Sequence, residues 1–513
     1  MSGRRRHVMA VRHKVFKIFS GFVDDLEGVL AEIEISVRPG IPTFDVIGLC
    51  DSSIKECRGR VRAAVISAGF LMPGGHVTVN ISPAYIKKSG TCCDLAVALG
   101  LLFVSEQLHA PRDSLIYAEG ELSLTGDVRP TPGGSMRLRA SCAKRFDYKL
   151  IPGGEEIAAG SACIDAMCVN TLFDAAAIFM EDDYRPQRFD PSMLSEVTPE
   201  LPDISCVKGQ EKAKRAILIA ASGRHNLMLL GSPGCGKTMA AKLTSEIMPP
   251  LTDKEKCEIC AINEIVSVGE EIKRPFRYIY PGITPGRILG SYKFQRPGEC
   301  IMANNGILFA DEICEFKPQL LDLLRIPMEN GTVSIDNGEK SSVLKSSFIF
   351  IGAGNPCRCG NLFEPGKKCT CSPSVRKRYM SKLSGPFIDR IDLFTEMRAV
   401  DPKALSEVAR NRADPEGAKM RELTVRASAM QKERFGEGVY NGNAPSVDSD
   451  ILRAPSDVVD TAVRIATSDG YSARGFGRLL RVGRTIADID GRADMNVADI
   501  MEAALYRRSV ITG

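Results

Sequence analysis

The sequence predicts an α/β protein of more than one domain that ends in a helical segment. Its 513 residues are enough for about two to four domains, each with its own core. Runs rich in β-branched residues alternate with helical segments from residue 14 to 180 and again from 204 to 400. From 401 to 513 the apolar residues recur at helical spacing, as in ARGFGRLLRVGRTIADID. We therefore expect two successive α/β domains and a helical C-terminal domain.

Composition indicates a folded protein and leaves its partners open. Hydrophobic residues make up 44% of the chain and charged residues 25%, which excludes disorder of the whole chain. The sequence has no run of about 18 apolar residues, and its basic start MSGRRRHVMAVRHKVF lacks the apolar segment of a secretory signal. We expect a cytoplasmic protein with no membrane partner. The net charge is only +4, so contact with nucleic acid would need a local basic patch.

Three segments precede the second α/β domain. Residues 1–13 are a basic extension whose RRRH at 4–7 is either a DNA-binding arm or a disordered tail. Residues 14–180 form the first α/β domain, with the β-rich runs VLAEIEISV and HVTVNIS and the helical segment SIKECRGRVRAAVISAGF. The polar stretch at 181–203 contains several prolines and is the predicted linker.

A glycine-rich loop near the start of the second α/β domain predicts a phosphate-binding site. It follows an apolar strand, fits G-x-x-x-x-G-K-[ST] and leads into a helix. Backbone N–H groups of such a loop and the helix N-terminus surround phosphates, while its lysine reaches the β- and γ-phosphates and its threonine holds Mg²⁺. ATP and Mg²⁺ are the expected ligands, and a chance glycine loop is the alternative. The loop consists of Gly231, Ser232, Pro233, Gly234, Cys235, Gly236, Lys237 and Thr238.

The apolar run NGILFADE (305–312) ends in two carboxylates that suit nucleotide hydrolysis. We expect Asp311 to hold Mg²⁺ through water and Glu312 to polarise the attacking water. An apolar run ending in Asp-Glu is common, so this prediction gains most of its weight from the phosphate-binding loop.

Two further side chains are candidates for contact with the transferred phosphate. The apolar run SSFIFIGAGNP contains Asn355 near its end, where an amide can contact the γ-phosphate or the water but is also a common turn residue. Arg390 lies in SGPFIDRID (384–392). An arginine can stabilise transition-state charge from a neighbouring subunit. The plainer alternative is a surface arginine paired with Asp389 or Asp392.

Four of the 17 cysteines fall within NPCRCGNLFEPGKKCTC (355–371). Two C-x-C pairs joined by a loop offer the four soft ligands that tetrahedral zinc prefers. Disulfides are a competing interpretation that a reducing cytosol disfavours, and isolated buried thiols are another. The prediction is a structural zinc site formed by Cys357, Cys359, Cys369 and Cys371.

Together these motifs resemble the magnesium-chelatase-like AAA+ ATPases of the YifB/ComM group. The resemblance lies in KGQEKAKRAILIAASGRHNLMLLGSPGCGKT, RPGECIMANNGILFADEICEF, NPCRCG and SGPFIDRID, and covers about 20 to 510 in order. It implies a Lon-protease-like N-terminal domain, a P-loop AAA+ core with inserted hairpins and a helical C-terminal lid. It also implies a homo-oligomeric ring, expected to be a hexamer, with ATP at the subunit interfaces.

The resemblance assigns roles that the residues alone leave open. Asn355 becomes the residue that senses the γ-phosphate, called sensor 1, and Arg390 the arginine finger. In the lid segment YSARGFGRLLRVGRTIADI, Arg474 stands at the sensor 2 position. Arg478 and Arg481 lie four and seven residues further, near the same helical face, so this assignment can slip.

Two inserted loops are candidate DNA contacts. The segment 329–347 reads as a hairpin around Asn337-Gly338, with Lys340 near its tip and Lys345 further along. A second loop at 286–299 interleaves basic with aromatic residues, which suits phosphate contact and base stacking. An ordinary solvated hairpin is the alternative in each case. The second loop offers Arg287, Tyr292, Lys293, Phe294 and Arg296.

The first domain resembles the Lon protease domain through IYAEGELSLTGDVRPTPGGSM and HVTVNISPAYIKKSGTCCDLAVALGLL. That protease uses a Ser-Lys dyad in which the lysine activates the serine. By this resemblance the serine position falls near Cys92, close enough to Ser89 and Thr91 that a small shift in alignment matters, and the lysine position falls near Met136. No lysine lies close to 136, and the nearest following one is Lys144. We therefore expect a domain without peptidase activity that serves assembly or substrate engagement.

The predicted function is an ATP-driven ring motor that moves branched or partly single-stranded DNA in recombination and natural transformation. The alternatives are a chelatase motor, an active protease and an ATP-dependent remodelling factor with no DNA substrate. One departure from the family pattern concerns P-F-R-A-P-H-H. Here Pro275-Phe276-Arg277 is followed by YIYPG, with Tyr280 and Pro281 in place of the two histidines.

Overall fold

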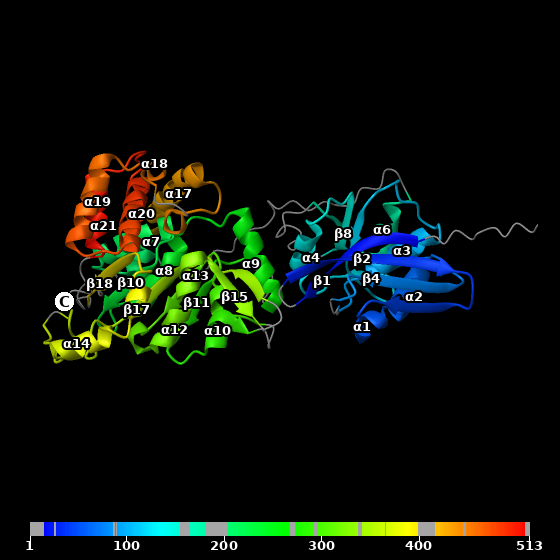
Figure 1. Cartoon of the computed structure of the whole chain (residues 1–513), viewed down its shortest axis with the longest axis horizontal. Helices are drawn as coiled ribbons and strands as arrows, with labels where there is room; N and C mark the ends of the chain where they lie inside the picture. Colours follow the sequence, from blue (N-terminus) through cyan, green and yellow to red (C-terminus); the bar gives the residue numbers. More distant parts are fainter. Residues whose placement is uncertain are drawn as a thin grey trace, which may run out of the picture. The chain divides into compact units, whose positions relative to one another are not determined.

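The computed structural model divides the chain into two compact units (Figure 1). Unit 1 comprises residues 1–195 and 263–270, and unit 2 comprises 196–262 and 271–513. The predicted extension 1–13 and the predicted linker 181–203, except Asp203, lie outside the described residues. The structure describes residues 15–24, 27–85, 88, 90–153, 165–180, 203–266, 272–291, 296–336, 341–364, 366–398, 416–444 and 448–507.

Unit 1 is built on a seven-stranded mixed sheet in the order β3-β4-β2-β1-β5-β8-β9. β1, β2 and β4 pair antiparallel, whereas β3 and the strands from β5 onward pair parallel with their neighbours. A short hairpin of β6 and β7 stands apart from this sheet. The strands are β1 (Val15–Asp24), β2 (Glu27–Arg38), β3 (Thr43–Ile47), β4 (His76–Ser82), β5 (Ile116–Ala118), β6 (Glu121–Leu122), β7 (Val128–Arg129), β8 (Tyr148–Pro152) and β9 (Met167–Val169).

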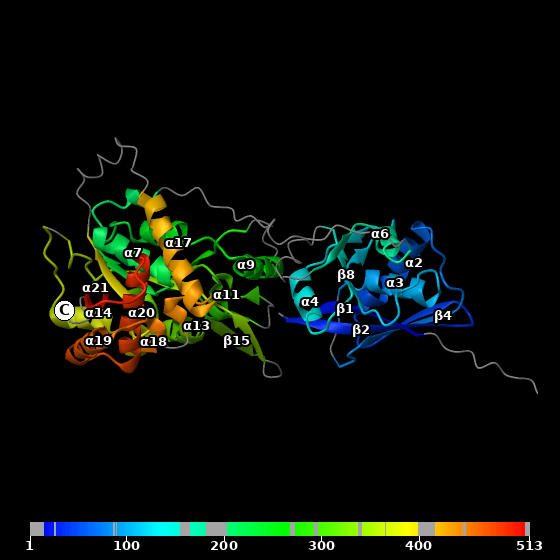
Figure 2. The same ribbon diagram turned by 90° about the horizontal axis from the view of Figure 1, so that it is seen from above.

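Helices cover both faces of this sheet. Because alternate residues of a strand point to opposite sides, one strand contributes side chains to the cores on both faces. Ile18 of β1 belongs to the core formed with α3, whereas the next residue, Phe19, packs with Leu138 of α4. Figure 2 shows α2, α3 and α6 on one side of β1, β2 and β4. The helices of unit 1 are α1 (Ser52–Lys55), α2 (Cys57–Ser67), α3 (Asp94–Val104), α4 (Gly134–Ser141) and α6 (Leu172–Ala177).

Unit 2 contains a five-stranded sheet in the order β11-β14-β17-β10-β18, in which every neighbouring pair is parallel. β10, β14 and β17 are buried along their whole length, as expected of parallel strands covered on both faces. Two small antiparallel hairpins, β12–β13 and β15–β16, are inserted. The strands are β10 (Leu227–Gly231), β11 (Phe276–Ile279), β12 (Gly290–Ser291), β13 (Arg296–Pro297), β14 (Ile307–Ala310), β15 (Thr332–Asp336), β16 (Ser341–Lys345), β17 (Ile349–Gly354) and β18 (Leu393–Met397).

The helices of unit 2 form two groups: those that precede β18 in the sequence and those that follow it. The first group is α7 (Glu211–Gly223), α8 (Lys237–Ile247), α9 (Asp253–Val266), α10 (Pro285–Leu289), α11 (Glu299–Met302), α12 (Pro318–Leu323), α13 (Arg325–Asn330), α14 (Pro373–Met380) and α15 (Gly385–Ile388). The second group is α17 (Glu416–Phe435), α18 (Ser449–Leu452), α19 (Ser456–Ser468), α20 (Ala473–Ile489) and α21 (Val497–Leu505). No described helix is both long and apolar enough to span a bilayer.

The second group of helices shares one apolar core with the sheet and α7. Buried residues of α20, such as Leu479 and Ile486, join Ile217 of α7 and Leu229 of β10 in this core. Figures 1 and 2 both show α17 beside α20. The sequence thus predicted the α/β class correctly, and the helical C-terminal segment folds onto the sheet domain as part of one unit.

A buried polar cluster joins three strands to α20 at the amino-terminal edge of the parallel sheet. Asn226, just before β10, accepts a hydrogen bond from the backbone of Phe350 (2.9 Å) and donates one to the carbonyl of Arg390 (2.9 Å). The backbone N–H of Asn226 donates to Asp392 Oδ2 (2.8 Å), and the guanidinium of Arg478 donates to Asp392 Oδ1 (2.5 Å). The cluster therefore sets where α20 begins relative to the strands.

The charge of Asp392 is stabilised within this cluster. Burial alone would raise the pKa of its carboxyl group, but the positive charge and hydrogen bond of Arg478, together with the nearby His225, whose Nδ1 lies 3.8 Å from Oδ2, outweigh that effect. The pKa of Asp392 consequently lies well below its usual value. The folded protein therefore holds Asp392 ionised against a buried guanidinium.

Replacing this carboxylate tests the cluster. We expect Asp392→Asn to lower the free energy of unfolding of unit 2 by about 3 kcal/mol at pH 7, because Arg478 is left buried without its counter-charge. Since the folded pKa is depressed, the stabilisation is present above the unfolded pKa of about 3.9 and is lost as the pH falls through the lower folded pKa. Urea unfolding followed by circular dichroism at pH 7 and pH 3 measures this.

The half-buried neighbour Asp389 supplies the control. Asp389→Asn is expected to cost less than about 1 kcal/mol at either pH. If Asp392→Asn lowers the free energy of unfolding equally at pH 7 and pH 3, the assignment of Asp392 as the ionised partner of Arg478 is contradicted.

Candidate active site

The phosphate-binding loop lies between β10 and α8, as the sequence predicts. Gly234 and Gly236 adopt left-handed backbone conformations, with φ of +78° and +90°. A side chain added at either glycine would have no atom within 4 Å. Glycine is favoured there by its backbone freedom, and the open space beside each glycine leaves room for a ligand against the backbone. The loop therefore fits a bound triphosphate.

Lys237 is buried at the start of α8 and turns back into the loop. Its ammonium group donates hydrogen bonds to the carbonyls of Gly231 (2.8 Å) and Ser232 (2.9 Å). It also lies 3.4 Å from Oδ1 of Asn355, which follows β17. Two residues that the sequence places in separate motifs thus meet at the carboxyl-terminal edge of the sheet.

Thr238 and the two acids complete the same corner. The Thr238 hydroxyl donates to Asp311 Oδ2 (2.9 Å), which joins the two oxygen groups expected to bind Mg²⁺. Glu312 follows in a left-handed conformation at φ of +51°, unusual for a residue with a side chain, and its N–H donates to Asp311 Oδ1 (2.9 Å). Strained backbone of this kind is concentrated at functional sites.

These residues line one cavity of about 460 Å³. Their arrangement suits positioning of a triphosphate and activation of a water, because Lys237, the oxygens of Thr238 and Asp311 and the carboxylate of Glu312 surround one space. The lining residues are Pro233, Gly234, Gly236, Lys237, Thr238, Met239, Asp311, Glu312, Gly354 and Asn355.

Tyr278 of β11 is a neighbour of this site that the sequence did not single out. Burial and the nearby charges of Asp311 and Glu312 raise the pKa of its hydroxyl group. The residue reaches the acids because β11 pairs with β14, with Tyr278 opposite Phe309. Only strand pairing reveals this proximity, since nothing in the local sequence links Tyr278 to the acids.

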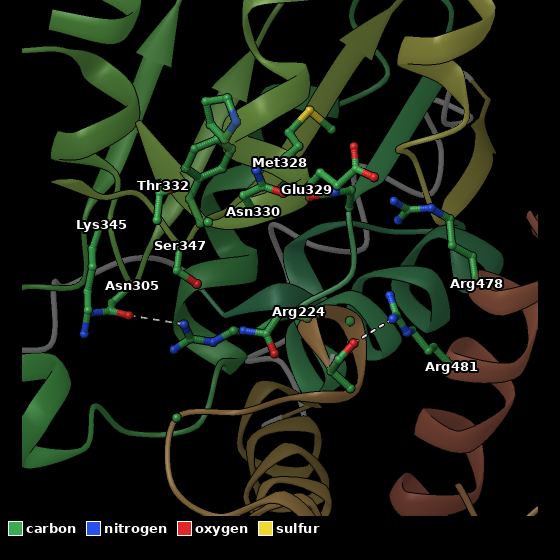
Figure 3. A pocket seen from close by; sticks show the side chains of 18 of the residues that line it. Arg224, Asn305, Met328, Glu329, Asn330, Thr332, Lys345, Ser347, Arg478 and Arg481 are labelled. Carbon is green, nitrogen blue, oxygen red and sulfur yellow. Dashed lines mark hydrogen bonds between the residues drawn. The ribbon is translucent and has the colours of Figure 1, made fainter. Parts of the chain in front are cut away.

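The two other predicted arginines lie at the opposite edge of the same sheet. Arg390 precedes β18, and Arg474 lies in the first turn of α20 beside the buried cluster. Arg474 lines a second cavity of about 730 Å³ (Figure 3), together with Asn226 and Ser347, which precede β10 and β17. Because all five strands are parallel, their amino ends and the phosphate-binding loop lie on opposite edges.

Arg390 is only 5% exposed and is held inside the subunit. Its guanidinium donates to the carbonyls of Arg325 (3.0 Å) and Pro386 (2.7 Å) and forms an ion pair with Glu329 of α13. The alternative of a surface arginine paired with Asp389 or Asp392 is therefore wrong. The arginine-finger role of Arg390 stays a prediction.

The structure distinguishes the three arginines on the first turns of α20. Arg478 is committed to Asp392, and Arg481 donates to the carbonyl of Ala444 (2.6 Å). The Arg474 side chain is 57% exposed, and its guanidinium forms an ion pair with Glu329 Oε1 at 2.9 Å. Of the three, Arg474 is best placed to reach another molecule.

The four predicted zinc ligands lie together. One Sγ atom from each of Cys357, Cys359, Cys369 and Cys371 falls within 4.8 Å of the others. The Sγ atoms of Cys357, Cys359 and Cys369 are 3.4 to 3.7 Å apart. Tetrahedral zinc with bonds of about 2.3 Å implies sulfur separations of about 3.8 Å, whereas a disulfide needs about 2.05 Å. The cluster fits zinc better than disulfides.

The cysteine loop rests on the phosphate-binding loop. A Cβ atom added to Gly360 would lie 2.8 Å from Cδ of Pro233, so the two backbones approach closely there. Glu364 of the same loop lies near enough to Cys235 for its charge to act on the pKa of that thiol, which burial raises. The cysteine loop is thus positioned to brace the wall of the 460 Å³ cavity.

The predicted DNA contacts are only partly described. The β15–β16 hairpin forms with Thr332 opposite Lys345, and Lys345 forms an ion pair with Glu258 at 2.5 Å. Arg287 pairs with Glu299 at 3.4 Å. Lys340, Tyr292, Lys293 and Phe294 lie outside the described residues, as does the side chain of Arg296.

The predicted dyad positions of the first domain carry no reactive pair. Cys92 is buried, its thiol donates to the carbonyl of Gly21 (3.3 Å), and burial raises its pKa to about 12. Met136 is buried in α4. A thiol held protonated at neutral pH is a poor nucleophile. Cys92 and Met136 therefore do not form a nucleophile and base pair, while the absence of peptidase activity and the Lon-like fold stay predictions.

Two glycines of the cysteine loop test its contact with the phosphate-binding loop. Gly360 and Gly366 have similar left-handed conformations, with φ of +76° and +79°, but only Gly360 lies against Pro233. We expect Gly360→Ala to weaken binding of a fluorescent ATP analogue about fivefold more than Gly366→Ala, a difference of about 1 kcal/mol. Equal dissociation constants for the two variants in equilibrium titrations would contradict this coupling.

Three family models match successive parts of the chain. The model described as magnesium chelatase, subunit ChlI, matches residues 203–405. The model described as subunit ChlI of Mg-chelatase matches 33–154. The model of the ChlI C-terminal part matches 415–507. The first of these includes every residue that lines the 460 Å³ cavity.

Two similar curated proteins match over nearly their whole length, and a third matches over part of it. The chain is 33% identical to the uncharacterized protein YifB of Salmonella typhimurium, over 93% of each chain. It is 31% identical to competence protein ComM of Haemophilus influenzae, over 94% of this chain and 96% of ComM. A magnesium-chelatase 38 kDa subunit of Cereibacter sphaeroides is 27% identical over 30% of this chain. With its motifs in the order that the resemblance describes and these relatives matched over nearly the whole chain, the chain belongs to the YifB/ComM family of magnesium-chelatase-like AAA+ ATPases.

Proposed function

We propose that this protein is an ATP-hydrolysing ring motor that acts on DNA, as a ComM-like branch-migration helicase in recombination and natural transformation. One structural observation is the main support for a ring. The phosphate-binding loop lies at the carboxyl edge of the parallel sheet, whereas Arg390 and Arg474 lie at its amino edge. Each subunit therefore offers a nucleotide site on one edge and arginines for another site on the opposite edge.

The length of the central strand separates these two edges. β10 runs from Leu227 to Gly231, a span of about 13 Å at roughly 3.3 Å per residue. The arginines are therefore poorly placed for the γ-phosphate held by their own loop. A head-to-tail interface brings the amino edge of one subunit to the carboxyl edge of the next, and such interfaces close into rings when the rotation permits. A hexamer is the ring size we propose.

Within each site the roles follow from position. Lys237 contacts the β- and γ-phosphates, while Thr238 and Asp311 hold Mg²⁺, whose charge offsets that developing on the phosphates. Glu312 orients and polarises the attacking water, and Asn355 contacts the γ-phosphate. Arg390 and Arg474 of the neighbouring subunit stabilise the transition state.

The proposal that DNA is the substrate rests on the inserted hairpins and on kinship with a competence protein. β15–β16 and β12–β13 extend from the sheet domain, and their sequences contain the lysines and aromatic residues that backbone contact and base stacking need. ComM is named as a competence protein. An ATP-dependent remodelling factor without a DNA substrate is the alternative.

We also propose that the four-cysteine cluster binds one structural zinc ion. The sulfur geometry supports it. Backbone N–H groups of Asn361 and Thr370 lower the pKa of the Cys359 thiol, whereas burial raises that of the neighbouring Cys357. Held this way, the loop keeps Gly360 against Pro233. The metal would act on ATP binding through the phosphate-binding loop.

A four-way DNA junction tests the motor. With ATP and Mg²⁺ the wild type is expected to hydrolyse ATP and to resolve the junction into duplex products on a native gel. Lys237→Ala should lose at least about 100-fold in hydrolysis, because the triphosphate loses its main cationic contact.

The two activities separate the candidate functions. A wild type that hydrolyses ATP but neither binds nor resolves branched DNA would overturn the DNA motor and favour the remodelling factor.

Metal analysis tests the cysteine cluster. Protein purified without chelator is expected to contain about one zinc per chain, and Cys359→Ser/Cys369→Ser should lose it, because two ligands do not retain the ion. Cys142→Ser removes an exposed cysteine outside the cluster and is the matched control. A wild type with clearly less than one zinc per chain would rule out the zinc site.

A further inference from the structure

One carboxylate connects the two arginines at the amino edge. Glu329 lies near the end of α13, and its Oε1 is 2.9 Å from the guanidinium of Arg474. Its Oε2 forms an ion pair with Arg390. Arg390 comes from the segment before β18 and Arg474 from the first turn of α20. Glu329 thus joins two arginines that are remote from each other in the sequence.

The charges around Glu329 do not balance. The other two hydrogen bonds of the Arg390 guanidinium go to neutral backbone carbonyls. Among the described residues, Glu329 is the only acid paired with either arginine. Two cations therefore share one anion, and without it the two like charges would repel each other. The carboxylate is what allows both guanidinium groups to stay at the same place.

The two arginines differ in how firmly they are held. Arg390 is buried and has two carbonyl partners besides Glu329. Arg474 is largely exposed, and its ion pair with Glu329 is the only one it forms among the described residues. Figure 3 shows Glu329 with Arg478 and Arg481 around the amino-edge cavity, where those two arginines already have partners. Arg474 is therefore the group that an incoming anion can draw away.

We propose that Glu329 is a positioning residue for ATP hydrolysis in the neighbouring subunit. In a subunit without a neighbour, it holds Arg390 and Arg474 together at the amino edge. When the triphosphate of the adjoining subunit reaches that edge, its larger negative charge draws Arg474 away from Glu329, while Glu329 and the two carbonyls hold Arg390 in place at the same edge. This inference rests on the proposed ring.

A neutral replacement of the same shape tests this role. Glu329→Gln keeps the side-chain shape and removes the charge. We expect kcat for ATP to fall about tenfold, with KM changed less than about twofold, because the nucleotide's own loop lies at the other edge. Glu416→Gln is the matched control: Glu416 pairs with Lys214 at 2.7 Å, and its side chain is 33% exposed against 34% for Glu329. The control should keep the wild-type kcat.

Mixing subunits separates positioning from a purely structural role. Lys237→Ala subunits lack a working phosphate-binding loop but keep an intact amino edge. Glu329→Gln subunits keep a working loop but have an altered amino edge. A one-to-one mixture should recover about a quarter of the wild-type rate, because random assembly forms the productive pair at about one junction in four. Using the double variant Lys237→Ala/Glu329→Gln in place of Lys237→Ala in the mixture should abolish this recovery.

The outcomes distinguish this inference from the proposed function. A Glu329→Gln variant with wild-type kcat, or a mixture no more active than the sum of its parts, would overturn the positioning role while leaving the motor intact. A wild type that shows no ATP hydrolysis would overturn the proposed function and this inference together.

Discussion

The hydrogen bonds of Asn226 and Asp392 are the interaction on which the arrangement of unit 2 depends. They join the amino ends of β10, β17 and β18 and anchor the first turns of α20 through Arg478. The strands are thereby kept parallel and in register, so their carboxyl ends meet where the phosphate-binding loop, the acids and Asn355 are needed. The same cluster places Arg474 at the opposite edge. Both halves of the proposed interfacial site thus follow from one buried polar network.

The cysteine loop and α13 connect these halves to the rest of the unit in different ways. At the carboxyl edge, the cysteine loop touches the phosphate-binding loop where Gly360 meets Pro233. At the amino edge, Glu329 holds Arg390 and Arg474 through charge. A close-packed contact changes little with ionic conditions, whereas a partly exposed ion pair is easily exchanged for another anion. The edge with the phosphate-binding loop is therefore held by packing, whereas the edge that we propose faces a neighbour is held by an ion pair that another anion can exchange.

Unit 1 combines a mixed sheet with helices on both faces, and its buried residues give no sign of hydrolytic chemistry at the predicted dyad positions. Tyr117, Glu119 and Arg137 form a buried network beside Cys92, in which Arg137 donates to Glu119 at 2.9 Å. Both hydrogen bonds go to Oε2 of Glu119 and hold the three side chains together inside the domain. This suits a domain that assembles subunits or engages a substrate, which is the role we propose for it.

The sequence by itself determined the parts of the site that lie in contiguous motifs: the phosphate-binding loop, Asp311 with Glu312, and the cysteine cluster. Local spacing was enough there, because each motif places its own functional atoms. Only the tertiary structure decided the partner of Arg390, which is Glu329, 61 residues away, and the neighbours Tyr278 and Gly360. It also decided that Arg474 faces away from its own phosphate-binding loop. These relations depend on strand order and on how α20 docks, and no local pattern of residues encodes a contact between distant segments.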